Sequence, residues 1–249
     1  GMSWRTGFAL INHYTANTQW QQAVETGKKY IKKYPSNYYI GLKYAKALCE
    51  TGQYQPCISL LNKMQVLPNE GSYAGRAVYR AANLYQAMEQ LSRKNYRQVM
   101  RNVEASKEWP ENLGVGKPYD DMIDSRLEDY LEAKALMGQG DNQKAATLLS
   151  SVAGYKTSRS RFGSGNLLTA LALRELGKEV EADRMVASWE TDFPENRITQ
   201  WCAAVYRGEM EKASGMLKSR NEQADTTPWE TSFRDSNFDL IVRLFSTAD

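Results

Sequence analysis

Six carboxylates between residues 120 and 132 form the densest group of side chains that could do chemistry. Asp124, Glu128 and Glu132 are four residues apart, which places them on one face of a helix. Such a face could ligate a divalent cation or serve glycoside hydrolysis. Acidic residues near a helix start also complement the helix dipole, and Arg126 lies among them. We therefore predict no metal-binding and no catalytic residue in this group, which consists of Asp120, Asp121, Asp124, Glu128, Asp129 and Glu132.

A basic group, Lys156, Arg159 and Arg161, lies in a Ser- and Gly-rich stretch before a predicted helix. Cationic side chains together with the free amides of a helix start can hold an anion. The same composition is common in exposed loops. These three residues are therefore a candidate anion site, with an ordinary exposed loop as the alternative.

Two motifs that would signal catalysis or cofactor binding are incomplete. His13 is the only histidine, which excludes HExxH zinc sites, and no GxSxG motif accompanies it to suggest a Ser–His–acid triad. The run 114–117 resembles part of a phosphate loop. However, Glu111 and Pro118 stand where that loop requires Gly and Ser or Thr. We predict no catalytic residue, no metal and no cofactor.

The composition narrows the classes of partner and compartment. Of 249 residues, 42% are hydrophobic and 24% are charged, with a net charge of +3. This charge is too close to neutral to indicate a nucleic-acid binder, and no apolar run reaches the roughly 20 residues of a membrane helix. Three cysteines without a CxxC pair favour buried free thiols in a reducing compartment. We therefore expect a cytoplasmic chain with neither nucleic acid nor membrane as partner.

Helical periodicity dominates the chain. Apolar residues from Trp20 to Tyr34 fall on one stripe of a helix that Pro35 ends, and a second stripe runs from Ala182 to Phe193 before Pro194. Alternating β-branched stretches bounded by turn residues are absent from the sequence. The pattern predicts an all-α protein.

The predicted helices come in pairs. Six short breaks separate the two members of each pair, and a small or β-branched residue stands about five positions after each break. These residues are Ala23, Cys57, Val99, Ala145, Ala182 and Ala213. A small side chain at this position lets the two helices of a hairpin approach closely. A lone hairpin leaves one flank exposed, so neighbouring hairpins must stack.

Residues 164–194 resemble a tetratricopeptide repeat, whose unit is a helix–turn–helix of about 34 residues. Ala170, Gly177, Ala182 and Pro194 match the small, turn, small and terminal-proline positions of that family's pattern. The resemblance implies a right-handed α–α superhelix forming one domain over residues 1–249. About six repeats would make it up, at 4–35, 37–68, 71–110, 120–155, 161–194 and 195–220, with a capping helix at 229–249.

In proteins of the family that this chain resembles, the first helices of the repeats line a concave groove that binds peptides. The pattern turns seven residues toward that groove, namely Tyr39, Leu42, Lys46, Tyr130, Lys134, Leu167 and Arg174. Aromatic anchors next to cations would suit an extended segment that carries acidic groups. The alternative is that several of these residues belong to the core.

A second resemblance rests on the connection 109–120 and the following Arg126 and Leu127. These residues are similar to the carboxy-terminal repeat region of large bacterial proteins of unknown function. Those proteins have a β-rich amino-terminal domain and tend to be associated with carbohydrate metabolism. The resemblance implies that the chain is the helical part of a longer bacterial protein.

The sequence is compatible with three functions. The favoured hypothesis is a non-enzymatic scaffold that binds a protein or peptide, and the second is a ligand-binding or regulatory arm of a carbohydrate-associated protein. An enzyme is the least favoured. The apolar residues of 236–245, with Phe238 and Ile241 among them, would either cover the last repeat or join two copies in a homo-oligomer.

Overall fold

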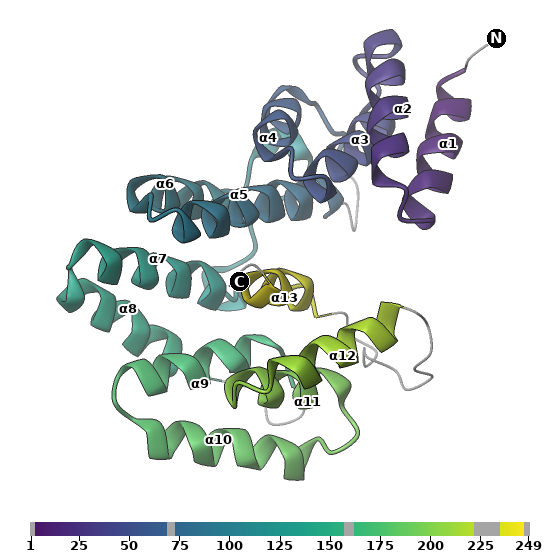
Figure 1. The fold of residues 1–249 in the computed structure, drawn as a ribbon. Coiled ribbons are helices and arrows are strands. Elements are labelled where there is room, and N and C mark those ends of the chain that lie inside the picture. Colours follow the sequence, from purple (N-terminus) through teal and green to yellow (C-terminus); the bar gives the residue numbers. More distant parts are fainter. Residues whose placement is uncertain (1–2, 69–72, 157–161, 222–234, 247–249) are drawn as a thin grey trace. The chain divides into compact units, whose positions relative to one another are not determined.

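The computed structural model describes residues 3–68, 73–156, 162–221 and 235–246. Over these residues the chain forms thirteen α-helices, two short 3₁₀-helices and no strand (Figure 1). The prediction of an all-α fold built from consecutive helix pairs is confirmed.

Twelve of the helices form six hairpins in chain order. The hairpins are α1 (Trp4–Ala16) with α2 (Trp20–Lys33), α3 (Tyr38–Glu50) with α4 (Tyr54–Lys63), α5 (Ala74–Ser92) with α6 (Tyr96–Lys107), α7 (Arg126–Gln139) with α8 (Asn142–Ala153), α9 (Gly165–Glu175) with α10 (Glu179–Asp192), and α11 (Arg197–Tyr206) with α12 (Met210–Asn221). The helix α13 (Phe238–Ser246) lies within the predicted terminal helix.

All six hairpins close with the same backbone turn. One residue of each turn has a positive φ, and these residues are Thr18, Gly52, Lys94, Gly140, Gly177 and Gly208. The amide of the next residue donates to the carbonyl five positions back, at 2.8–2.9 Å in every turn. This bond is the long hydrogen bond of a Schellman motif, which ends one helix and turns the chain into the next.

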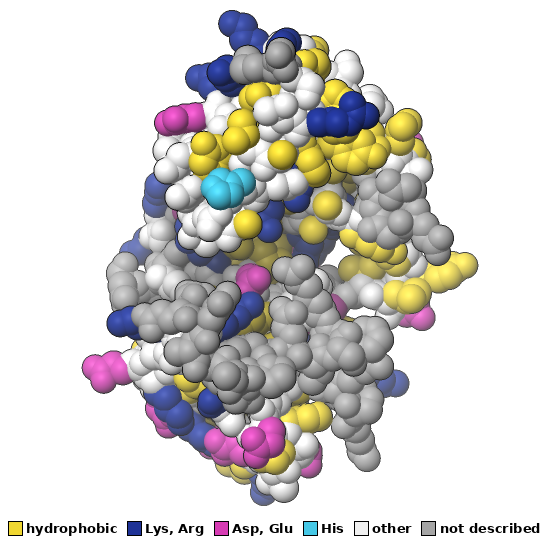
Figure 2. Space-filling model, turned by 90° about the vertical axis from the view of Figure 1, so that its right-hand side faces the viewer, with side chains coloured by type: hydrophobic (Ala, Val, Ile, Leu, Met, Phe, Trp, Pro, Cys, Tyr) yellow, Lys and Arg dark blue, Asp and Glu magenta, His cyan; other side chains and the backbone are white. Residues whose placement is uncertain are grey.

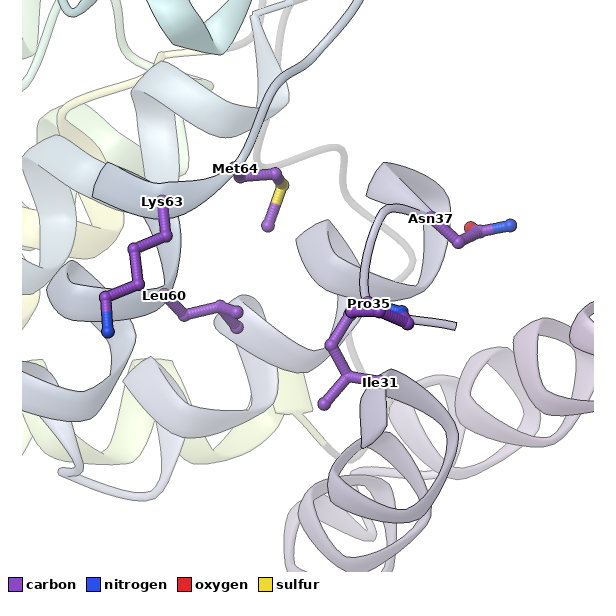
Figure 3. Close-up of a pocket in the computed structure, with 6 residues that line it drawn as sticks. All are labelled: Ile31, Pro35, Asn37, Leu60, Lys63 and Met64. Atoms are coloured by element: carbon purple, nitrogen blue, oxygen red, sulfur yellow. The ribbon is translucent and has the colours of Figure 1, made fainter. Parts of the chain in front are cut away.

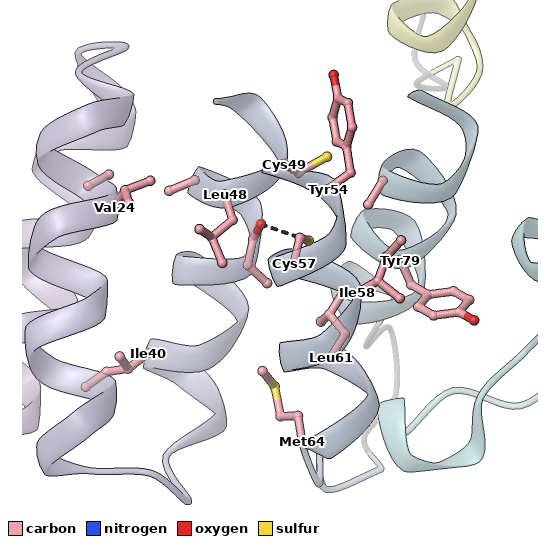
Figure 4. Close-up of a cluster of buried hydrophobic side chains, with 14 of the residues drawn as sticks. Val24, Ile40, Leu48, Cys49, Tyr54, Cys57, Ile58, Leu61, Met64 and Tyr79 are labelled. Carbon is pink, nitrogen blue, oxygen red and sulfur yellow. Dashed lines mark hydrogen bonds between the residues drawn. The ribbon is translucent and has the colours of Figure 1, made fainter. Parts of the chain in front are cut away.

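The six small residues predicted to face a partner helix are buried, with exposed fractions of 0–2%. Each lies five positions after the positive-φ residue of its turn. Cys57 shows the geometry directly, because its thiol on α4 donates to the carbonyl oxygen of Ala45 on α3 at 3.1 Å (Figure 4). The turn and the small residue together fix how closely two paired helices approach.

The long connection after α6 caps an earlier helix. It contains the 3₁₀-helices η1 (Glu111–Leu113) and η2 (Asp120–Met122). The side-chain amide of Asn112 donates to the carbonyl oxygens of Leu61 at 2.9 Å and Met64 at 2.8 Å, at the end of α4. The repeat predicted to start at residue 120 therefore has its first α-helix from Arg126, because residues 120–122 form a separate turn.

The described helices group into two compact units. Unit 1 comprises residues up to Ala87 together with Arg101–Ile123, and unit 2 comprises Met88–Met100 together with residues from Asp124 onward. In unit 1, Ile11, Ile40 and Leu61 belong to one buried cluster (Figure 4 shows part of it).

Gly177→Ala is expected to destabilise the fold by about 1 kcal/mol, because alanine pays a backbone cost in the left-handed region that glycine avoids. No atom lies within 4 Å of the new methyl position, so the cost is conformational rather than steric. Gly116→Ala is the matched control, since its methyl group also meets nothing and its φ is not left-handed. Urea titration followed by circular dichroism measures both variants. Equal losses, or none at Gly177, would contradict this account of the turn.

Candidate binding surface

One pocket of unit 1 is too small for a substrate or cofactor. The pocket in Figure 3 has a volume of about 50 Å³ and is lined by Ile31, Pro35, Asn37, Leu60, Lys63 and Met64. Ligand pockets usually measure about 300–1,000 Å³. Among the residues that the structure describes, no group of three His, Cys, Asp or Glu side chains is placed to hold a metal ion.

The carboxylates of 120–132 do not form a common site. Asp124 makes a bidentate pair with Arg126, at 2.9 Å to Nε and 2.7 Å to Nη2, while Asp129 accepts from the hydroxyl of Ser125 at 2.9 Å. The Arg126 guanidinium is buried, donates to Asn166 at 2.9 Å and lies 4.0 Å from the ring centroid of Tyr155. Arg126 is thus a buried anchor that joins α7 to α9, a role its charge did not reveal in the sequence.

Of the candidate anion site, Lys156 is exposed, whereas Arg159 and Arg161 lie outside the described residues. The amide of Ser164, at the start of α9, donates to the carboxylate of Asp235 at 2.6 Å. The start of this helix is therefore bonded to an anion that the chain itself supplies.

The groove residues predicted in unit 2 make structural contacts. Leu167 is fully buried and Tyr130 is 7% exposed, which corrects their assignment to an open groove surface. The Tyr130 hydroxyl on α7 donates to Glu175 on α9 at 2.7 Å, and Lys134 donates to the same oxygen at 3.1 Å. Burial, and then the charge of Glu175, raise the pKa of Tyr130. Arg174 donates to the Tyr206 carbonyl at 3.1 Å. These residues tie the first helices of adjacent hairpins together.

The groove residues predicted in unit 1 are more exposed than Leu167 and Tyr130 of unit 2. Tyr39 on α3 is 47% exposed, Lys46 is exposed, and Leu42 is half-buried against the unit 1 cluster. The Lys46 ammonium lies 5.9 Å from the ring centroid of Trp20. Tyr39 and Lys46 are therefore on the surface of α3.

Tyr39 is the centre of a group of four aromatic rings, which we call the aromatic platform. Its ring stacks on Trp4 of α1 at 5.9 Å and on Tyr38 at 4.3 Å, and it meets the edge of Phe8 at 6.1 Å. Trp4 and Phe8 are one helical turn apart, so α1 presents both to α3. Sequence reasoning missed these two residues and Tyr38, although the four-residue spacing of Trp4 and Phe8 was a visible signal.

Two cations lie against the aromatic platform. The Arg5 guanidinium is 4.8 Å from the Trp4 ring centroid, and the Lys43 ammonium is 5.8 Å from that of Phe8. Cations at such distances are attracted to the ring faces. Sequence reasoning missed both residues. In the upper part of Figure 2, where α1 faces the viewer, hydrophobic and basic side chains lie next to one another.

The four helices α1–α4 have a strong charge imbalance. They carry eight Lys and Arg residues against only Glu25 and Glu50, although the whole chain has 32 basic and 29 acidic residues. The aromatic platform is thus part of a group of helices with an excess of positive charge. The near-neutral net charge of the whole chain conceals this local excess.

No protein-family model matches the chain, and comparison with curated proteins finds no significant match. Within the described ranges, no helix combines the length and the apolar character needed to cross a membrane. On its geometry, the candidate site is the aromatic platform with Arg5 and Lys43, together with Lys46 on the same helix as Tyr39.

Leu167→Ala is expected to cost about 2–5 kcal/mol of stability, because it opens a cavity at a fully buried position. Tyr39→Ala should cost only about 1 kcal/mol, since nearly half of this side chain faces solvent and ring contacts are the main loss. Thermal unfolding followed by circular dichroism compares the two variants. A loss at Tyr39 as large as at Leu167 would mean that Tyr39 is a core residue and that the platform is not a binding surface.

Proposed function

We propose that the chain is a non-enzymatic scaffold of the tetratricopeptide type. Its aromatic platform binds an extended, acidic segment of a partner protein. The observation that carries this proposal is the exposure of Tyr39 at the centre of stacked rings that have cations beside them. This arrangement offers contact area and charge on one surface, with no enclosed cavity needed.

The rings supply the binding energy in this proposal. Tyr and Trp offer large, rigid contact areas at low entropic cost, and they are common among residues that dominate interfaces. Tyr39 is held by Trp4 and Tyr38, so little ring freedom remains to be lost when a ligand packs on it. A partner side chain that covers the ring removes its exposed apolar surface from water.

The cations supply selectivity. Arg5 and Lys43 flank the rings on α1 and α3, and the surrounding helices carry few acidic residues that could neutralise them. Positive charge of this kind speeds the encounter with acidic partners and disfavours basic ones. Because α1 and α3 are the first helices of consecutive hairpins, an extended segment crossing from one to the other could reach both cations.

A second candidate is the ligand-binding arm of a carbohydrate-associated protein. The observation that favours it is the same exposed stack of Tyr38 and Tyr39, because aromatic faces also pack on the apolar faces of sugar rings. A neutral sugar would gain little from Arg5 or Lys43. The dependence of binding on charge therefore separates the two candidates.

A fluorescent eight-residue peptide that alternates Glu with Leu or Phe is expected to bind the chain, as measured by anisotropy. Lys43→Glu should weaken binding about tenfold, which corresponds to about 1.4 kcal/mol, because it replaces attraction by repulsion. Lys29→Glu makes the same charge change at an exposed position of α2 and should have a smaller effect. Raising the salt concentration should weaken binding as well.

Equal effects of Lys43→Glu and Lys29→Glu would show that only general charge attraction is at work, against a site at the platform. Tyr39-dependent binding of a neutral oligosaccharide, unaffected by Lys43→Glu, would favour the carbohydrate arm. Absence of peptide binding at millimolar concentration would contradict the proposed scaffold.

A further inference from the structure

In unit 2, the last described helix is bound by two other helices. Trp201 of α11 is buried, and its ring meets the edge of Phe238 at 5.2 Å and of Phe245 at 6.5 Å. Both phenylalanines belong to α13, where Ile241 is also fully buried. From α12, the Arg220 guanidinium lies 5.1 Å from the Phe238 ring and donates to Asp239 at 2.9 Å. We call the surface that α13 contacts the α13 seat. It is marked by Trp201 and Arg220, together with Ser164 at the start of α9.

The carboxylate of Asp235 links the residues before α13 to this seat. One oxygen of Asp235 accepts from the amide of Ser164 at 2.6 Å, and the other accepts from the amide of Asn237 at 2.9 Å. Asp235 therefore bridges the amino ends of α9 and α13, where amides otherwise lack partners. Its negative charge also suits the positive end of the α9 dipole.

Among the described residues, two polar atoms that belong to the seat lack a hydrogen-bond partner. In the described structure, the indole nitrogen of Trp201 and the hydroxyl of Ser164 are buried without a hydrogen-bond partner. The Trp201 ring contacts α13, and the Ser164 amide contacts Asp235, three residues before α13. A buried donor without an acceptor lowers the affinity of the occupant that covers it. A ligand that offered oxygen acceptors at these two positions would bind the same seat more tightly.

We propose that the α13 seat is a site for an amphipathic helix of a partner protein and that α13 is its displaceable intramolecular occupant. The ligand pattern is the one that α13 shows: an acidic residue followed by apolar residues three, six and ten positions later, as in Asp235, Phe238, Ile241 and Phe245. The partner helix would add polar side chains that accept from Trp201 and Ser164. Recognition of this kind is that of a helix in a groove, distinct from an extended peptide on the aromatic platform.

Attachment to the same chain favours α13 over any competitor. A tethered segment acts at an effective concentration of about millimolar, so a partner helix must exceed this advantage. The two unpaired donors lower the affinity of α13 for the seat. A helix that offers acceptors to both donors could therefore displace α13. The seat is therefore predicted to be closed to weak ligands and open to a specific one.

The experiment uses the full chain with a protease site inserted between residues 226 and 227. The probe is a fluorescent peptide of residues 234–249, followed by anisotropy before and after cleavage. We expect the cleaved chain to bind the peptide at least tenfold more tightly than the intact chain, because cleavage removes the tether. The Asp235→Asn peptide should bind at least tenfold more weakly than the native peptide, since the charge-assisted bond to the Ser164 amide is lost. A peptide with Ile241→Asp is the control that should not bind.

Three results would overturn the proposal. In the first, the segment stays bound after cleavage and does not exchange with a hundredfold excess of peptide. In the second, displacement removes more helical circular dichroism than the nine residues of α13 can account for, which would make α13 part of the core. In the third, light scattering shows that the intact chain is a dimer through exchange of α13, which would make a second copy the occupant. None of these outcomes would change the binding of the acidic peptide to the aromatic platform. Each of the two proposals can therefore be contradicted without the other.

Discussion

The structure depends on one local constraint: a left-handed residue followed five positions later by a small buried side chain. The turn reverses the chain at a fixed point, and the small residue lets the second helix settle against the first. Four of the six turns use glycine, whereas Thr18 and Lys94 adopt the same conformation at a cost that packing must offset. First helices of successive hairpins come side by side within a unit, as α1 and α3 do in unit 1 and α7 and α9 do in unit 2.

The two units use the flanks of their first helices in different ways. In unit 1, α1 and α3 leave aromatic rings and cations on the surface, with Tyr39 at the centre. In unit 2, the corresponding residues are buried or paired, as the contact of Tyr130 with Glu175 shows, and Trp201 of α11 is covered by α13. One unit thus offers a surface for an extended acidic ligand in our proposal, while the other already holds a helix. The same architecture could thereby serve two kinds of ligand.

Much of the fold could be predicted from the sequence, because helix stripes, turn glycines and small residues are local signals. The candidate binding surface could be predicted only in part. Tyr39 and Lys46 lie on the surface, but Trp4 and Phe8 were missed because they belong to a different helix from Tyr39. Leu167 was misplaced since α9 is apolar on most sides, and periodicity does not tell which neighbour covers which side. The division into two units had no local signal either, because the repeating pattern runs through both.

The central claim, that the chain captures acidic partners through the aromatic platform, is tested most directly by comparative affinity capture. Immobilised wild-type chain and a Tyr39→Ala, Lys43→Glu double variant would be exposed to lysate of the source organism, with bound proteins quantified by mass spectrometry. The account predicts at least one protein with an acidic segment that the wild type recovers in stoichiometric amount and the variant loses. The same proteins recovered in the same amounts by both would contradict it.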